Sequence, residues 1–172
     1  FITYAGCSTK QLKEFKEDFL IEFRQYYVGP EILRYCNMVR AMDCAYDSIL
    51  NRVSVVDLQL IRKDVAVHSD MLYWSPEEKL ENCGVQLLNV MFSVPQISVR
   101  LVESTPEQIK LIKNFLSYWN EHRDIILHGK LEFKKPEIGY TEVSSVKEHK
   151  KITVLNAKNS YCYTQGEEDI FN

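Results

Sequence analysis

The sequence has little net charge and no long apolar run. Its 172 residues carry a formal net charge of -3. A nucleic-acid-binding protein needs a concentrated basic surface, whereas the one basic cluster here, residues 147–151, is interrupted by Glu148 and His149. No apolar run approaches the roughly 18 to 20 residues of a membrane span, and no signal peptide is visible. We therefore expect a soluble protein that contacts neither nucleic acid nor a membrane.

The cysteines lack the spacing of a metal site or of a disulfide framework. They are odd in number, and no two form a Cys-x-x-Cys pair (Cys7, Cys36, Cys44, Cys83 and Cys162). We expect buried free thiols, which suit a reducing cytoplasm. His122, His128 and His149 also lack partners at metal-ligand spacing, so no metal and no other cofactor is expected.

Length and composition are those of an ordinary globular protein. Apolar residues make up 45% of the chain and charged residues 26%, which argues against disorder. The length suits one domain, or one domain with a small appendage. The chain starts at Phe1, without a Met, in sequence that already reads as structured, which fits a piece of a longer protein.

Helical patterns alternate with short apolar runs in the first part of the chain. A capping-box pattern at Ser8 and Gln11 predicts an amphipathic helix over residues 9–26. Residues 35–39 and 64–67 are predicted as buried parallel strands, the second ended by the polar side chains that follow it. Between them we expect a loop that could include a helical turn, and then residues 53–60, which fit a strand or a short helix.

Two further helices and one more strand complete this alternation. Residues 75–78, Ser-Pro-Glu-Glu, predict the start of a helix, and residues 96–100 predict a third strand. Thr105 and Gln108 form a second capping box, which predicts a long helix that ends before Gly129.

Beyond Gly129 the sequence period changes. Short alternating segments separated by polar or Gly/Pro turns predict a small antiparallel β unit (residues 131–133, 140–146, 151–155 and 160–164). Because strand–helix alternation gives way to strands alone, we expect a domain boundary here, with residues 1–129 in one domain and 130–172 in the other.

Two stretches place ionisable side chains directly beyond apolar, strand-like runs. They are residues 40–47 and residues 68–70, His-Ser-Asp. Active sites of β/α folds open at the carboxyl ends of parallel strands, so these stretches are a candidate pair of site loops. Asp43 and Asp47 also have a structural alternative, which is a helix cap and an ion pair with Arg52. Residues 68–70 are not a catalytic triad, because adjacent strand residues point to opposite faces.

Several motifs in this order resemble the late catalytic segment of glycoside hydrolase family 36 α-galactosidases. The resemblance covers roughly residues 8–140 and rests on these motifs: Arg40-Ala-x-Asp43, Asp47, Asn51-Arg52, Val56-Asp57-Leu58, Ala66 through Asp70 to Trp74, Gln86-Leu87, Phe92 to Val99, Trp119, and His122-Arg123-Asp124. It implies an α/β fold consisting of the C-terminal portion of a (β/α)8 TIM barrel followed by a small antiparallel β unit. It also implies removal of terminal α-linked galactose.

The resemblance assigns catalysis to Asp43. It makes Asp43 the acid/base and lets Arg40 touch the sugar hydroxyl next to the reacting carbon, with Asp47 as the rival acid. An acid must hold a proton near neutral pH, and burial of Asp43 against its apolar neighbours Met42, Cys44 and Tyr46 would favour this.

The resemblance also implies substrate contacts on the second loop. His68 and Asp70 would line the barrel mouth near the sugar, although a loop hydrogen-bond network fits them equally well. Trp74 could stack on a sugar face, with a hydrophobic staple before a helix as the alternative.

The family's nucleophile lies in a Lys-x-Asp strand motif, and no such strand precedes Asp43. We therefore expect the acid/base half of a retaining site, inactive alone, whose substrate is an α-galactoside oligosaccharide. The alternative is a non-catalytic carbohydrate-binding or interaction module of the same fold. Open strand edges of a partial barrel predict a homo-oligomer or association with the missing barrel half.

Overall fold

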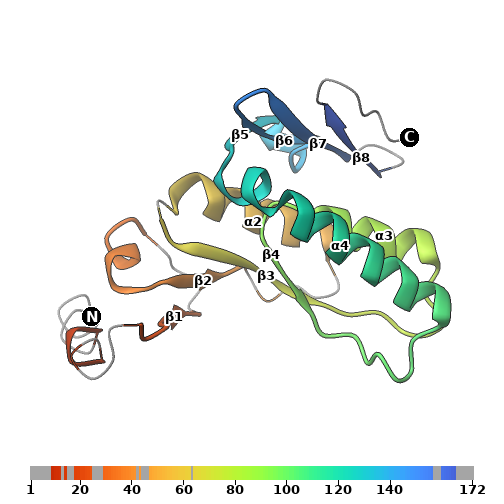
Figure 1. Cartoon of the computed structure of the whole chain (residues 1–172), viewed down its shortest axis with the longest axis horizontal. Helices are drawn as coiled ribbons and strands as arrows, with labels where there is room; N and C mark the ends of the chain where they lie inside the picture. The colour runs from red at the N-terminus through yellow and green to blue at the C-terminus, as the bar shows by residue number, and fades with distance from the viewer. Residues whose placement is uncertain are drawn as a thin grey trace.

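The computed structural model is an α/β structure with two separate four-stranded sheets (Figure 1). It describes residues 9–12, 14, 18–24, 29–41, 43, 47–62 and 64–156, and the backbone of residues 160–165. In this part of the chain no helix is long and apolar enough to cross a membrane. The elements up to the last helix are β1 (Glu22–Phe23), η1 (Ile32–Tyr35), β2 (Met38–Arg40), α2 (Ser48–Ile61), β3 (Ala66–Leu72), α3 (Leu80–Asn89), β4 (Val94–Ile97) and α4 (Pro106–His128).

The first sheet is parallel throughout. Strands β1, β2, β3 and β4 lie side by side in chain order, and α2 and α3 form the crossovers that parallel neighbours require. Val39 and Val67 belong to a small apolar cluster against which Leu58 of α2 packs. Arg40 and His68, one residue further along, are register partners, so their side chains lie on the opposite face of the sheet.

The helix predicted over residues 9–26 is wrong in its second half. Residues 9–12 and 14 are helical, but Glu22–Phe23 is strand β1 and pairs with β2. Asn37 holds this segment from both sides: Ile21 N donates to Asn37 Oδ1 at 3.0 Å, and Asn37 N donates to Ile21 O at 2.9 Å. Helical periodicity is a weak prior, and here long-range pairing overrides it.

Strand β3 passes through residues 68–70, where the sequence predicted its end. Ser69 and Asp70 are fully buried, yet both have partners. Ser69 Oγ accepts a hydrogen bond from Gln96 N at 2.9 Å, and Asp70 N lies 3.4 Å from Asn51 Oδ1. These partners, together with the ion pair between Asp70 and Arg40, let the polar run continue the strand inside the protein.

Several other boundaries differ from the prediction. Residues 53–60, which fitted a strand or a helix, lie inside α2. Helix α3 starts at Leu80, because residues 75–78 form a turn in which Glu78 N donates to Ser75 O at 3.1 Å. Strand β2 starts three residues later than predicted, after η1, and β4 starts two residues earlier.

The long helix and the antiparallel unit were predicted correctly. In α4 both hydrogen bonds of the capping box between Thr105 and Gln108 are present. The helix ends at Gly129, where a Cβ would collide with the Ser145 side chain and lie 2.6 Å from the Ile125 carbonyl oxygen. The second sheet is antiparallel and consists of β5 (Lys130–Lys134), β6 (Glu142–Lys147), β7 (Lys150–Asn156) and β8 (Ser160–Gln165), with the 3-10 turn η2 (Pro136–Ile138) after β5.

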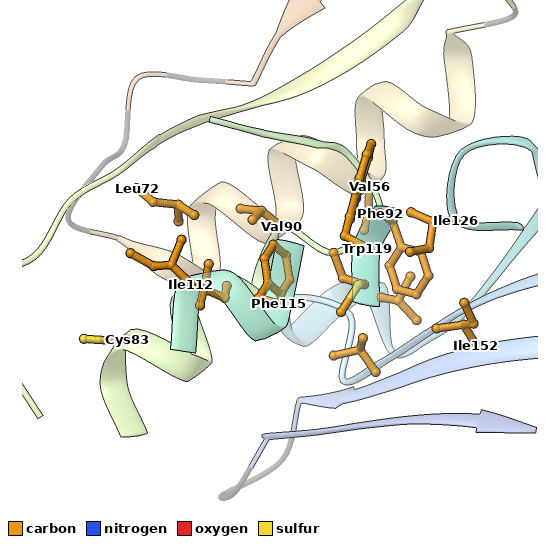
Figure 2. Packing of buried hydrophobic residues seen from close by; sticks show 14 of the residues in the cluster. Val56, Leu72, Cys83, Val90, Phe92, Ile112, Phe115, Trp119, Ile126 and Ile152 are labelled. Atoms are coloured by element: carbon orange, nitrogen blue, oxygen red, sulfur yellow. The ribbon is translucent and has the colours of Figure 1, made fainter. Parts of the chain in front are cut away.

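One apolar cluster joins the two sheets through the helices. Phe115 and Trp119 of α4 and Val90 after α3 lie between the parallel sheet and Ile152 of β7 (Figure 2). Helices α3 and α4 therefore form a middle layer with one sheet on each side (Figure 1). The other face of the parallel sheet, which carries Arg40, lies away from these helices.

The described cysteines are free thiols. Cys83 is fully buried and Cys36 is half-buried, and burial raises the pKa of both. The side chains of Cys7, Cys44 and Cys162 lie outside the described residues.

Candidate active site

Arg40 connects two carboxylates at the carboxyl end of β2. Its side chain is only 11% exposed, and its guanidinium nitrogens lie 3.6 Å from Asp70 Oδ1 and 3.9 Å from Asp43 Oδ2. Both distances are longer than a hydrogen bond, so these contacts are ion pairs. The structure therefore brings together three of the residues that the sequence singled out, on the sheet face opposite α2.

A second charged group lies on the same face. His68 Nε2 is 3.0 Å from Glu22 Oε1, and Arg24 Nε is 3.3 Å from the same oxygen. His68 Nδ1 lies 3.0 Å from Ser69 O, so both ring nitrogens face oxygen acceptors.

Sequence reasoning missed Glu22 because its segment was predicted as a helix. In a strand, alternate residues share a face, so Glu22 and Arg24 lie on one side of β1. A period of two around residues 22–24 was the signal that could have found them.

Asp43 is open to solvent, which contradicts the burial expected for it. Its side chain is 54% exposed in the loop between β2 and α2. Met42, Cys44 and Tyr46, which were expected to cover it, lie outside the described residues. The argument that these neighbours bury Asp43 and so keep it protonated therefore has no support.

Asp47 is the N-cap of α2, as the structural alternative predicted. Its Oδ1 accepts a hydrogen bond from Leu50 N at 2.8 Å. The ion pair with Arg52 in that alternative is wrong. Arg52 is buried and donates from Nε to Gly139 O at 2.7 Å and from Nη1 to Asn89 Oδ1, and burial lowers its pKa.

His68 and Asp70 lie in strand β3 and not in the loop that was expected to hold them, and they pair with different partners, Glu22 and Arg40. Asp70 has no exposed surface and faces Arg40, while His68 is half-buried. A ligand on this face could reach His68, whereas Asp70 would act on a ligand only through Arg40.

Trp74 belongs to the core, so the predicted sugar-stacking role is wrong for it. Its side chain is 5% exposed and packs in the main apolar cluster with residues of α3 and α4. The staple alternative fails too, because the N-cap of α3 is Lys79, five residues later. Its neighbour Tyr73 is the exposed aromatic residue at this strand end.

No metal site is formed by the described part of the chain, where no three His, Cys, Asp or Glu side chains gather. Two pockets lined by described residues lie away from Arg40. One is beside Cys36 and Asn37 at the amino end of β2, and the other is between α4 and the β6–β7 turn.

Solved structures with a similar fold include family 36 α-galactosidases, as the sequence motifs led us to expect. The galactosidase domain of the α-galactosidase–sucrose kinase AgaSK has a TM-score of 0.65 at 12% identity, over 86% of this chain and 22% of that chain. The α-galactosidase AgaB of Geobacillus stearothermophilus has a TM-score of 0.63 at 14% identity, over 93% of this chain and 24% of that chain.

A hydrolase with another substrate in its name also shares the fold. The cyclic α-maltosyl-(1→6)-maltose hydrolase of Arthrobacter globiformis has a TM-score of 0.56 at 11% identity, over 95% of this chain and 51% of that chain. No family model and no curated protein matches the sequence. The chain thus spans about a quarter of the galactosidases and half of the maltose hydrolase, and at these identities the likeness shows the fold.

Proposed function

We propose that this chain is part of a retaining α-galactosidase and carries its acid/base, Asp43. One observation carries the proposal: Asp43 and Arg40 form an ion pair at the carboxyl end of a parallel strand, on the sheet face away from the helices. This is the position in which β/α folds carry catalytic groups. The likeness to family 36 α-galactosidases over most of the chain supports the same assignment.

Asp43 would work on the leaving group. In a retaining mechanism the acid protonates the glycosidic oxygen and later takes a proton from the attacking water. Arg40 can donate N–H groups to a sugar hydroxyl, and Asp70 already compensates its charge. The positive charge that Asp43 faces is therefore already neutralised by Asp70. The exposed position of Asp43 lets it reach a substrate.

The nucleophile would come from polypeptide beyond this sequence. It must lie roughly 5 to 5.5 Å from the acid. Among the described carboxylates on this face, Asp70 is fully buried and Glu22 is engaged by His68 and Arg24. We propose that further parallel strands pair at the outer edges of β1 and β4 and complete a (β/α)8 barrel. A second copy of the chain could occupy the same edges, which would appear as self-association.

Asp43→Asn in the complete enzyme, with Asp47→Asn as matched control, tests the proposal. An asparagine in place of Asp47 can still cap α2, so the control preserves the fold. We expect Asp43→Asn to lower turnover of galactosides with poor leaving groups by roughly 100-fold or more, because general acid catalysis contributes that much. Activated aryl galactosides need less protonation and should be spared. Equal, mild losses on both substrates, or the same pattern in Asp47→Asn, would refute the assignment.

A non-catalytic sugar-binding or interaction module is the second candidate. The engagement of the other described carboxylates on this face favours it. Galactose binding without hydrolysis, measured on the chain alone and in the complete enzyme, would support this candidate. Parallel assays with α-galactosides, α-N-acetylgalactosaminides and α-glucosides would identify the sugar, because hydrolases with different substrates share the fold.

A further inference from the structure

Gln108 makes more contacts than a helix cap requires. We infer that it is a positioning residue that holds the β3–α3 loop, residues 73–79, as the leaving-group wall of the active site, with Tyr73 as the residue that contacts the departing sugar. The catalytic part of this inference rests on the proposed function. The loop-holding part rests on the geometry of Gln108 alone.

The side chain of Gln108 is buried and every polar atom of it is used. Only 2% of the residue is exposed. Its Nε2 donates to the carbonyl oxygens of Ser75, Pro76 and Glu78 at 3.1, 3.3 and 3.3 Å, and its Oε1 accepts from Thr105 N at 3.1 Å. The two N–H groups of this buried amide are shared among three carbonyls of one loop and restrict that loop, because losing them would leave those acceptors unpaired.

Gln108 thereby ties two neighbouring loops together. Thr105 ends the loop that follows β4, and residues 75–78 belong to the loop that follows β3. Both loops leave the carboxyl ends of adjacent parallel strands, the edge at which β/α folds bind their ligands. The amide acts as a crosslink between two parts of the same wall.

The position of this wall relative to Asp43 points to the leaving group. Strand β3 pairs in parallel with β2, so its loop leaves the same edge of the sheet as the loop that carries Asp43. An acid that protonates the glycosidic oxygen must lie beside the group that departs. The group that departs from an oligosaccharide is a sugar, so the wall should take a pyranose ring.

Tyr73 is the side chain of this wall best suited to a sugar. It is 37% exposed, whereas Leu72 and Trp74 on either side are buried and anchor the backbone. Its aromatic face offers a stacking surface for a sugar ring, and its hydroxyl can hydrogen-bond to sugar hydroxyls.

Two substitutions separate the two roles of Gln108. Gln108→Glu keeps a side-chain acceptor for Thr105 N, as Glu does in ordinary capping boxes, but a carboxylate cannot donate to the loop carbonyls. Thr105→Ala removes the cap and keeps the three loop bonds. Gln108→Met serves as a second variant without a buried charge, in case the Glu variant does not fold.

Hydrogen exchange on the 172-residue chain tests the loop-holding part. We expect Gln108→Glu and Gln108→Met to speed exchange of the Glu78 and Asn82 amides roughly tenfold or more, because the turn they close loses its support. Thr105→Ala should speed exchange only in the first turn of α4. Unchanged exchange in residues 75–82 of a folded Gln108 variant would overturn the inference.

Substrate discrimination in the complete enzyme tests the leaving-group part. Tyr73→Ala should lower kcat/KM for a galactosyl oligosaccharide roughly three- to tenfold, the range of one aromatic contact. α-Galactosyl fluoride, whose leaving atom cannot reach Tyr73, should change by less than about twofold, and Tyr73→Phe should retain activity on both. Equal losses on both substrates would overturn the role of Tyr73.

The hydrogen-exchange experiment and the substrate-discrimination experiment can give negative results independently of each other. If the complete enzyme hydrolyses no galactoside, the proposed function is wrong and the leaving-group role of Tyr73 falls with it. The exchange experiment still decides whether Gln108 holds the loop.

Discussion

Replacing Arg52 with Met should destabilise the protein by about 2 to 4 kcal/mol. Arg52 is a buried cation on α2 whose Nε and Nη1 donate to Gly139 O and Asn89 Oδ1. Gly139 follows η2 and Asn89 ends α3. The Arg52 side chain therefore connects α2 to the end of α3 and to the turn that leads into β6. Met keeps most of the apolar stem and removes both donors.

The magnitude follows from opposing terms. A hydrogen bond from a charged donor contributes roughly 1.5 to 3 kcal/mol, and both acceptors would lose their partner. Removing a buried cation relieves its desolvation, which is the same effect that lowers the pKa of Arg52. The loss of the two hydrogen bonds outweighs the relief of desolvation, because an acceptor left unpaired inside the protein has no water that could replace Arg52.

Urea unfolding of single and double variants measures this. Arg52→Met combined with Asn89→Leu should show a coupling of roughly 1 kcal/mol or more, since the two residues share a bond. The pair Arg52→Met and Asp47→Asn should be additive within about 0.5 kcal/mol, because Asp47 caps α2 and does not touch Arg52. A cost below about 1 kcal/mol, or stronger coupling to Asp47 than to Asn89, would refute the reasoning.

Two further predictions concern single side chains. Asp47→Ala should cost about 1 kcal/mol in urea unfolding through loss of the bond to Leu50 N, and Asp47→Asn should cost almost nothing; equal costs would contradict the capping role. Burial, and then the hydrogen bond to Asp57, raises the pKa of Tyr140 to about 12. Its folded pKa exceeds the unfolded value, so its contribution to stability is complete below about pH 10 and is lost as the pH rises towards 12. Ultraviolet titration should show a late-titrating tyrosine component that Tyr140→Phe removes; a titration curve that Tyr140→Phe leaves unchanged above about pH 10 would contradict this.

The candidate site differs from its sequence expectation in where the charges are balanced. The expectation was a buried acid, whereas Asp43 is open and Asp70 is the buried carboxylate. Arg40 lies between them, so the buried charge is paired inside the sheet and the open one remains available to a ligand. This division of roles is what the proposed acid/base function needs from the two residues.

Local patterns in the sequence were enough for several elements. The capping box of α4 involves residues three apart, and the turns and alternation after Gly129 involve neighbours in the chain. The cap of α2 by Asp47 is local in the same way. Such contacts form within one turn or one hairpin, so their residue types and spacing determine them regardless of the rest of the fold.

The tertiary structure decided where segments distant in the chain meet. β1 replaced a predicted helix because its strand partner comes sixteen residues later, where Met38 of β2 pairs with Glu22. Trp74, which was expected to stack on a sugar, is buried because it packs against α3 and α4, whereas Tyr73 beside it is exposed. The second role of Gln108 required a loop some thirty residues away. The residue type determines which interactions a side chain can make, but its burial and its partners come from packing, which brought these distant side chains together.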